Sequence, residues 1–231
     1  MAFKVIIDGK PCSGKTTLSC EVEKKLNSEG VSAIDAKSYA LESGFMSGFL
    51  GKFMEGEIES YRSLVHSATY HVLSYVALEE SAWKNNSKYE VVILQRSPYS
   101  FSFMIEATKS AFGKEPSHKQ PNLLYGLIKT WAEFVRPELL IYLTTDVETL
   151  RERFKHRPDG RDRIHAQMIE ADDSKYVEML RGYMHNNLRV IENDSSVEEG
   201  AEKIAAAIKE AYSSVKLRRS LPFGAKHEGS Q

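Results

Sequence analysis

A stretch close to the N-terminus has the residue types and the spacing that phosphate binding requires. Residues 9–17 read Gly-Lys-Pro-Cys-Ser-Gly-Lys-Thr-Thr and fit the pattern G-x-x-x-x-G-K-[ST]. A loop that carries glycine lets successive backbone N–H groups turn toward a phosphate without a Cβ atom in the way, and the following helix adds its positive N-terminal end. We therefore predict that ATP is bound by Gly9, Lys10, Pro11, Cys12, Ser13, Gly14, Lys15, Thr16 and Thr17.

Two side chains of this loop have the chemistry of phosphoryl transfer. Lys15 is predicted to reach the β and γ phosphates as a catalytic cation, and Thr16 is predicted to ligate Mg²⁺ through its hydroxyl. A chance match in a turn between a strand and a helix is the alternative. The apolar run over residues 3–7 and the helical pattern that begins near Lys15 argue against chance, because the motif requires this context.

A third candidate side chain, Arg96, follows an uninterrupted apolar run over residues 91–94. Such a run is typical of a strand buried in a parallel sheet, and ligands of open α/β sheets bind at the carboxyl ends of the strands. Arg96 is therefore predicted to be catalytic and to hold the acceptor phosphate or the transferred group. The alternative is a surface arginine at the end of a strand.

Five arginines are concentrated between residues 151 and 163. Pro158 and Gly160 interrupt the helical pattern there, so we predict a lid over about residues 155–163 whose guanidinium groups close on phosphates. A solvated charged surface is the alternative. Three of these arginines belong to the predicted lid. Arg161 is predicted to be catalytic, and Arg157 and Arg163 are predicted to contact ATP.

Alternating strands and helices must position these side chains. Apolar runs predict strands at residues 3–7, 31–35, 91–94, 139–144 and 190–191. Helical spacing predicts helices at about residues 17–26, 57–83, 119–135, 146–154, 164–184 and 196–212. The order predicts an α/β fold of three layers, the P-loop NTPase fold, with a five-stranded parallel sheet flanked by helices. We expect one kinase domain over residues 1–213 and a flexible tail over residues 214–231.

Composition limits the partners of the chain. The net charge of -1 gives no basic excess, so we expect no nucleic-acid polymer as a partner. Only two cysteines occur, too few for a disulfide framework or a zinc site. No apolar run approaches the length that crosses a bilayer, so we expect no membrane and a cytoplasmic location. A nucleotide is the expected partner, and a homodimer stays open.

Taken in order, the motifs resemble the thymidylate kinase and deoxynucleoside kinase group of P-loop nucleotide kinases over residues 3–210. The doubled threonine of the loop fits this group, and Leu94-Gln-Arg-Ser97 resembles its signature of an acidic residue followed by arginine. Residues 137–143 look like its fourth strand. Residues 162–164, followed by Tyr176 and Gly182-Tyr183, are similar to its lid and the helix after it. The ordered set is more specific than the loop alone.

The resemblance implies Mg²⁺-dependent transfer of the γ-phosphoryl group of ATP to a nucleotide, with a nucleoside monophosphate such as dTMP as the main prediction. A deoxynucleoside kinase is one alternative. A catalytically weak ATP-binding regulatory protein is an alternative of another class. We expect the acceptor to be contacted by Lys37, Arg62, His66, Tyr70 and Arg96.

Several positions depart from the pattern of this group. Gln95 stands where the group has an acidic residue, and an amide is a poor ligand for magnesium, so the metal would depend on Thr16 and the phosphates. The same substitution counts against a deoxynucleoside kinase, because glutamine cannot serve as its acid. Pro11 stands where thymidylate kinases usually carry a carboxylate that reads the sugar hydroxyl. His66 and Tyr70 replace a base-stacking aromatic residue and a base-reading arginine, so thymine specificity does not carry over.

Overall fold

The structure is a computed structural model, and it describes most of the predicted sheet and the helices after it. The described residues are 2–36, 88–97, 99–100, 103, 126, 128–130, 132–133, 136–156 and 163–220. The helix predicted over residues 57–83 lies outside them. In the helix predicted over residues 119–135, the described residues are helical.

The described strands form one parallel sheet with the N-terminal strand at its centre. The strands are β1 (Phe3–Gly9), β2 (Ala33–Asp35), β3 (Val91–Gln95), β4 (Leu139–Thr144) and β5 (Leu188–Glu192), and their order is β2-β3-β1-β4-β5. Near-continuous apolar runs suit β1, β3 and β4 to burial on both faces. The predicted five-stranded parallel sheet is therefore confirmed.

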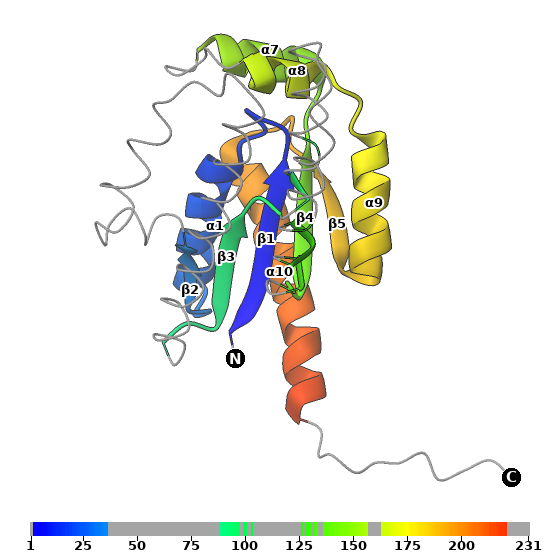
Figure 1. The fold of residues 1–231 in the computed structure, drawn as a ribbon. Helices are drawn as coiled ribbons and strands as arrows, with labels where there is room; N and C mark the ends of the chain where they lie inside the picture. The colour runs from blue at the N-terminus through cyan, green and yellow to red at the C-terminus, as the bar shows by residue number, and fades with distance from the viewer. Residues whose placement is uncertain are drawn as a thin grey trace, which may run out of the picture.

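Helices cover both faces of this sheet (Figure 1). On one face, α1 (Lys15–Ser28) and α10 (Val197–Ser220) pack on alternate residues of β1 such as Val5 and Ile7. On the other face, α9 (Ser174–Met184) packs with Ile6 and Tyr142. Side chains of β1 alternate between the two cores because successive residues of a strand point to opposite faces. The three layers of the predicted fold are thus present.

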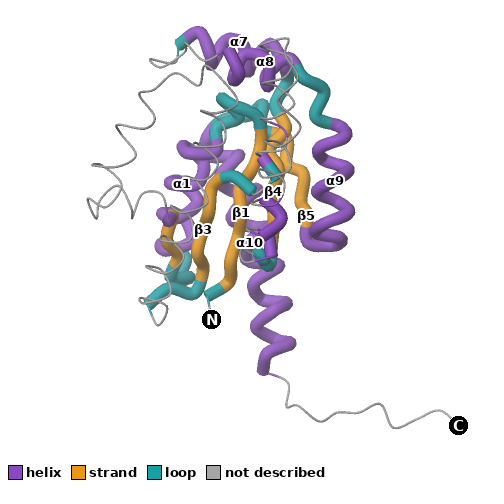
Figure 2. The backbone as a smooth tube through the Cα atoms, viewed as in Figure 1, coloured by secondary structure: helices purple, strands orange, loops and turns teal. Residues whose placement is uncertain are grey.

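Two short helices lie over the carboxyl edge of the sheet. They are α7 (Val147–Lys155) and α8 (Arg163–Glu170), and Figure 2 shows the loops from the strand ends running beneath them. The predicted cap of α7 is present, because the N–H of Thr149 donates to the Asp146 carboxylate at 2.7 Å. A 3₁₀ turn at His185–Asn187 leads from α9 into β5.

Two predicted helix boundaries were wrong. One helix was predicted over residues 164–184, but the chain forms α8 and α9 with a break between them. The Asp172 carboxylate accepts hydrogen bonds from the N–H and the hydroxyl of Ser174, a local arrangement that competes with a continuous helix. The last helix was predicted to end at residue 212, but α10 continues to Ser220. Ion pairs of its added turns with Glu90 and Glu138 account for the extension; they are Lys216–Glu90 at 3.5 Å and Arg219–Glu138 at 3.0 Å.

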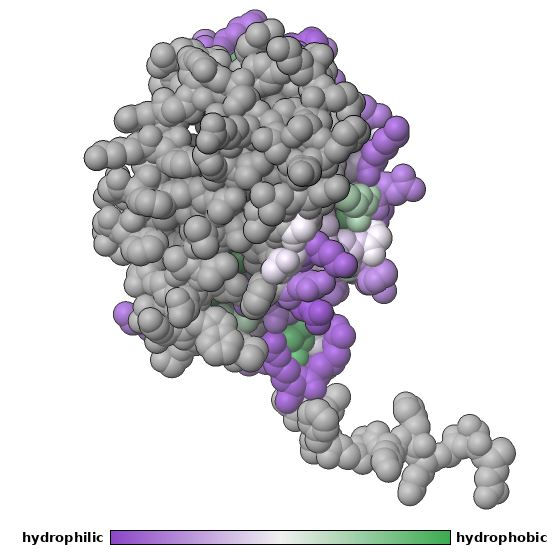
Figure 3. All heavy atoms as spheres, in the orientation of Figure 1, coloured by the Kyte–Doolittle hydropathy of each residue, from purple (hydrophilic) through white to green (hydrophobic). Residues whose placement is uncertain are grey.

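The described surface of these helices is mainly hydrophilic on the face that Figure 3 shows. Large hydrophobic side chains are exposed singly in the described part of the chain, at Met179, Val190, Val197 and Leu217. No described helix is both long enough and apolar enough to cross a membrane.

Candidate functional site

The loop after β1 has a backbone that only glycine accommodates at two positions. Gly9 has a φ of 148°, and a Cβ there would lie 2.7 Å from the Leu143 carbonyl oxygen. Gly14 has a φ of 87°, and a Cβ there would lie 2.8 Å from Asn193 Nδ2. The loop leads directly into α1, which begins at Lys15. The glycine positions therefore fit the loop geometry that phosphate binding needs.

The ammonium group of Lys15 lies inside this loop. Its Nζ donates to the carbonyl oxygens of Gly9 at 2.8 Å and Lys10 at 2.6 Å, and to Ser13 Oγ at 3.3 Å. The side chain is buried. These bonds fix a positive charge next to the backbone N–H groups at the start of α1, where a phosphate would be attracted by both. The geometry suits the predicted role of Lys15.

Side chains from distant segments hold the loop in place. Asn193, just after β5, donates from Nδ2 to the carbonyl oxygen of Ser13 at 2.8 Å. Arg153 of α7 donates to the carbonyl oxygens of Cys12 and Asn193, each at 3.4 Å. Cys12 has a φ of 64°, an uncommon conformation for a residue with a side chain. The loop is therefore shaped by tertiary contacts as well as by its own glycines.

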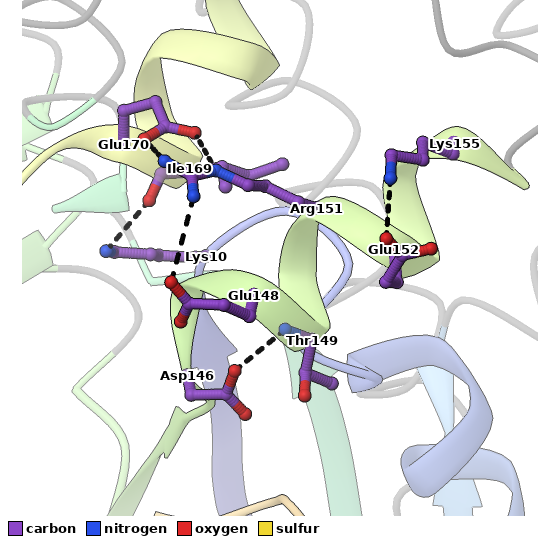
Figure 4. A network of polar contacts seen from close by, with 9 residues as sticks. All are labelled: Lys10, Asp146, Glu148, Thr149, Arg151, Glu152, Lys155, Ile169 and Glu170. Carbon is purple, nitrogen blue, oxygen red and sulfur yellow. Dashed lines mark hydrogen bonds and ion pairs between the residues drawn. The ribbon is translucent and has the colours of Figure 1, made fainter.

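Lys10 connects the loop to the helices above it. Its Nζ donates to the carbonyl oxygen of Ile169 at 3.2 Å, near the C-terminal end of α8 (Figure 4). It also donates to the carbonyl oxygen of Ala171, just after that helix, at 2.6 Å. A cation is favourable at this end of a helix. Arg151 of α7 forms an ion pair with Glu170 of α8, and its hydrogen bonds hold the pKa of the Glu170 carboxyl below its usual value. The Lys10 side chain thus supports α8, and its predicted contact with ATP would fall to its backbone N–H.

Thr16 belongs to a polar cluster that also contains Gln95, Ser19 and Asp35. The Thr16 hydroxyl donates to Gln95 Oε1 at 2.9 Å. Gln95 Nε2 donates to Ser19 Oγ at 2.7 Å and to Asp35 Oδ2 at 3.1 Å. Asp35 is the last residue of β2, and its carboxylate is fully buried. Because a carboxylate accepts but does not donate, Asp35 fixes the orientation of the Gln95 amide, whose oxygen then faces Thr16.

A second polar cluster lies at the end of β1 and contains the buried carboxylate of Asp8. It accepts hydrogen bonds from Ser97 N at 3.1 Å, Ser100 Oγ at 2.7 Å and Tyr176 Oη at 2.7 Å. Burial, followed by the charge of Asp8, raises the pKa of Tyr176 well above its usual value, so this hydroxyl keeps its proton. Arg96, which precedes Ser97, has a φ of 72°.

The structure brings Lys15, Thr16 and Arg96 to one edge of the sheet, because Ile7 of β1 pairs with Gln95 of β3. The predicted acceptor residues other than Arg96 and the predicted lid residues are not placed. The acceptor residues Lys37, Arg62, His66 and Tyr70, and the lid residues Arg157 and Arg161, lie outside the described residues. Arg163 begins α8, but its side chain is likewise outside the description. The arginine-rich lid therefore stays a prediction.

Sequence reasoning missed both carboxylates of the site. Asp8 and Asp35 each stand at the carboxyl end of an apolar strand, which is the edge where α/β sheets bind ligands. That position was the signal that could have identified them. No group of three or more metal-binding side chains (His, Cys, Asp or Glu) occurs within the described ranges.

A phosphate loop between the central strand and the first helix of a parallel sheet, with an arginine and two carboxylates at the same edge, is the arrangement of P-loop phosphotransferases. The chain matches the deoxynucleoside kinase family over residues 5–213 and belongs to that family. The predicted group, which joins thymidylate kinases and deoxynucleoside kinases, is thereby confirmed. No match is found among curated proteins.

Solved structures of a deoxyadenosine kinase from M. mycoides have a similar fold. The structure with bound dATP is 16% identical to this chain with a TM-score of 0.55, and the structure with bound dCTP is 14% identical with a TM-score of 0.57. Each comparison covers 90% of this chain and 100% of the other chain. These identities support the fold alone. The family supports a nucleoside acceptor better than the nucleoside monophosphate of the main prediction, and it does not confirm thymidylate kinase-like specificity.

Proposed function

We infer that this protein transfers the γ-phosphoryl group of ATP to a hydroxyl of a deoxynucleoside. Membership of the deoxynucleoside kinase family supports this acceptor class. The deoxyadenosine kinase structures, with dATP or dCTP bound, support nucleotides as ligands of this fold. The loop geometry around Lys15 supports ATP as the donor, because the Lys15 ammonium lies inside a loop that leads directly into the N-terminus of α1, where phosphate is favoured.

The position of Asp35 is the observation that carries this proposal. A hydroxyl acceptor must lose a proton during transfer, whereas a monophosphate already offers an anionic oxygen, so only the hydroxyl needs a carboxylate as proton acceptor. Gln95 cannot take that role, but it holds the Asp35 carboxylate through hydrogen bonds of 3.1 and 3.4 Å. The family has a carboxylate at position 95 and this chain does not; here a carboxylate lies beside that position, on Asp35 at the end of β2. We assign Asp35 as the proton acceptor.

Magnesium would be bound mainly by Thr16 and the phosphates of ATP. The Thr16 hydroxyl hydrogen points to Gln95 Oε1, which directs the hydroxyl oxygen toward a cation as a ligand. A bound Mg²⁺ would neutralise phosphate charge during transfer. Arg96, Arg157, Arg161 and Arg163 are proposed to supply further positive charge, and Lys37, Arg62, His66 and Tyr70 are proposed to contact the acceptor.

A coupled assay of ADP release tests the acceptor class. Purified protein would be incubated with ATP, Mg²⁺ and each of the common deoxynucleosides, and in parallel with their monophosphates. We expect turnover with at least one deoxynucleoside and little with the monophosphates. Turnover with monophosphates alone would restore the main prediction from the sequence. ATP binding without turnover on any acceptor would favour the alternative of a catalytically weak ATP-binding regulatory protein. The neutral Gln95 is the reason for testing that alternative.

Two substitutions make this test specific for the site. ATP stabilises the folded protein only if it binds to it. Lys15→Ala should therefore abolish the increase in stability that ATP causes, because the variant no longer binds ATP. Asp35→Asn should lower turnover of deoxynucleosides about 10²- to 10⁴-fold and leave the ATP dissociation constant nearly unchanged. Asp173→Asn is the matched control. Asp173 also accepts a hydrogen bond, from Tyr142, but it lies at the start of α9 and is not assigned a role in proton transfer. Equal losses in both aspartate variants would contradict the role of Asp35.

A further inference from the structure

Four hydrogen-bond donors from three parts of the chain converge on the Asp8 carboxylate. The Gly9 N–H at 2.8 Å comes from the phosphate loop itself. The Ser97 N–H and the Ser100 hydroxyl come from the turn after β3, and the Tyr176 hydroxyl comes from α9. Each of the four side chains in this cluster is at least nine-tenths buried. The cluster therefore joins the start of the phosphate loop to the residues around Arg96 and to the helix after α8.

The direction of the hydrogen bonds in this cluster is determined by its chemistry. A carboxylate only accepts, so the Tyr176 hydroxyl must donate its single proton to Asp8. The bond between Tyr176 Oη and Ser97 Oγ, at 2.9 Å, must then be donated by Ser97. Ser97 is thus held twice, by its backbone N–H on Asp8 and by its hydroxyl on Tyr176. Removing the Tyr176 hydroxyl would deprive Asp8 of a donor and Ser97 of an acceptor.

The neighbour of Ser97 adopts a conformation that needs such support. Arg96 has a φ of 72°, which costs a residue with a side chain about 1–2 kcal/mol. The Arg96 N–H donates to the carbonyl oxygen of Ile7 at 2.9 Å, and the following N–H donates to Asp8. Hydrogen bonds on both sides of Arg96 therefore maintain a backbone that would otherwise relax. The direction of the Arg96 side chain depends on this backbone.

We propose that Tyr176, acting through Asp8 and Ser97, is a positioning residue that holds Arg96 in the geometry needed at the transferred phosphate. The proposal rests on the proposed phosphotransferase function. It adds to that function a structural connection between α9 and the reacting end of β3. Because α9 follows α8, whose end is bound by Lys10 of the loop, both ends of the segment 170–176 are attached to the phosphate site.

A double-mutant cycle between positions 176 and 96 tests this proposal. Arg96→Ala should lower turnover on the order of 10²-fold, and Tyr176→Phe should lower it about tenfold. In the Arg96→Ala background, Tyr176→Phe should cost less than about twofold, because its target is already absent. Additive losses would show that Tyr176 acts on something other than Arg96 and would overturn the proposal.

Tyr183→Phe is the matched control. It lies on the same helix and loses a hydrogen bond of 2.6 Å to the Ala132 carbonyl oxygen, while its ring, which phenylalanine keeps, packs on Tyr99 at 4.5 Å between centroids. Its turnover should stay within about twofold of the unmodified protein. Losses as large as those of Tyr176→Phe would mean that any weakening of α9 has this effect. If Tyr176→Phe does not fold, Ser97→Ala replaces it in the cycle, because it removes the donor of the same bond.

A binding measurement separates this proposal from the proposed function. The ratio of the ATP and ADP dissociation constants reports the contact with the γ-phosphate and needs no turnover. Arg96→Ala should weaken ATP more than ADP, Tyr176→Phe should do so to a smaller degree, and the double mutant should match Arg96→Ala. Absence of turnover with every acceptor would reject the function only. If neither single variant changes the ratio of the ATP and ADP dissociation constants, Arg96 does not contact the γ-phosphate. That result would overturn the positioning role of Tyr176.

Discussion

Two buried aspartates lie on opposite sides of the end of β3, and their surroundings differ. Asp35 accepts hydrogen bonds from Gln95 and Ser19, and Gln95 in turn contacts Thr16, which is exposed at the start of α1. Asp8 accepts from Ser97, Ser100 and Tyr176, which are buried as Gln95 and Ser19 are, and from the half-buried N–H of Gly9. The first cluster adjoins the surface where ATP and Mg²⁺ are expected. The second is enclosed.

The difference indicates a division of tasks between consecutive residues. Gln95 belongs to the cluster of Asp35, while Arg96 and Ser97 are held by Asp8. An enclosed cluster with every donor paired stabilises one geometry, because any unpaired member would be costly in a buried site. A cluster that reaches the surface through a threonine can exchange partners when a ligand binds. We therefore expect changes at Asp8 to lower stability strongly, in addition to their effect on turnover through Arg96, and changes around Asp35 to affect mainly chemistry.

The largest expected effect separates the two aspartates by stability. Asp8→Ala leaves four donors without their acceptor, three of them on buried residues, and should lower the free energy of unfolding by roughly 3–5 kcal/mol. Asp35→Ala removes an acceptor from Gln95 and Ser19, and Ser19 Oγ keeps the Thr16 carbonyl oxygen as another acceptor, so this change should cost about 1–3 kcal/mol. Urea unfolding of both variants measures the difference. A larger loss for Asp35→Ala would contradict the division of tasks.

A smaller effect is expected from a charge placed in the cluster of Asp35. Gln95→Glu would replace a donor to the Asp35 carboxylate with a second carboxylate, and should destabilise the protein by roughly 2 kcal/mol in the absence of nucleotide. ATP with Mg²⁺ should reduce this loss, because the cation offsets the added charge. Gln95→Met is the control, since it loses the same hydrogen bond without adding charge. Thermal unfolding with and without the ligand measures both, and equal ligand effects would argue against a metal beside this cluster.

The smallest expected effect appears only at alkaline pH and probes the cluster of Asp8. Burial raises the pKa of Tyr176 above the value of 10.0 that it has when unfolded. Its contribution to stability is therefore complete below pH 10 and is lost as the pH rises, at about 1.4 kcal/mol per pH unit. Tyr176→Phe should reduce the slope of stability against pH by that amount. Unfolding curves at about pH 9 to 11 measure it, and an unchanged slope would mean that Tyr176 is not a buried donor.

The sequence was sufficient for the sheet and for the loop, because both are specified by local pattern. Apolar runs identify β1, β3 and β4 wherever a strand is buried on both faces. The spacing of Gly9 and Gly14 identifies a loop whose conformation excludes a Cβ atom. The division between α8 and α9 was missed because apolar residues continue at helical spacing across Asp172, and only the bonds to Ser174 reveal the break.

The polar clusters could not be predicted because their members are far apart in the sequence. Tyr176 is 168 residues from Asp8, and Gln95 is 60 residues from Asp35. An aspartate at the end of a strand also fits a turn or a helix cap, so its type alone does not distinguish these roles. In the arginine-rich segment, too, the residue type alone does not distinguish the roles of the side chains. Arg153 contacts the phosphate loop and Arg151 pairs with Glu170, although both have the same chemistry in the sequence.

The contact of Asn193 with the phosphate loop has a consequence for the synthesis of this protein. The Asn193 amide donates to the Ser13 carbonyl oxygen across a separation of 180 residues, and Gly9 packs against the carbonyl of Leu143 in β4. A growing chain emerges from the ribosome N-terminus first, so the loop is made early but its supports are made late. The ability to bind nucleotide should therefore arise only after β5 and Asn193 have been synthesised, and a nascent chain that stops before β5 should expose an immature loop to chaperones.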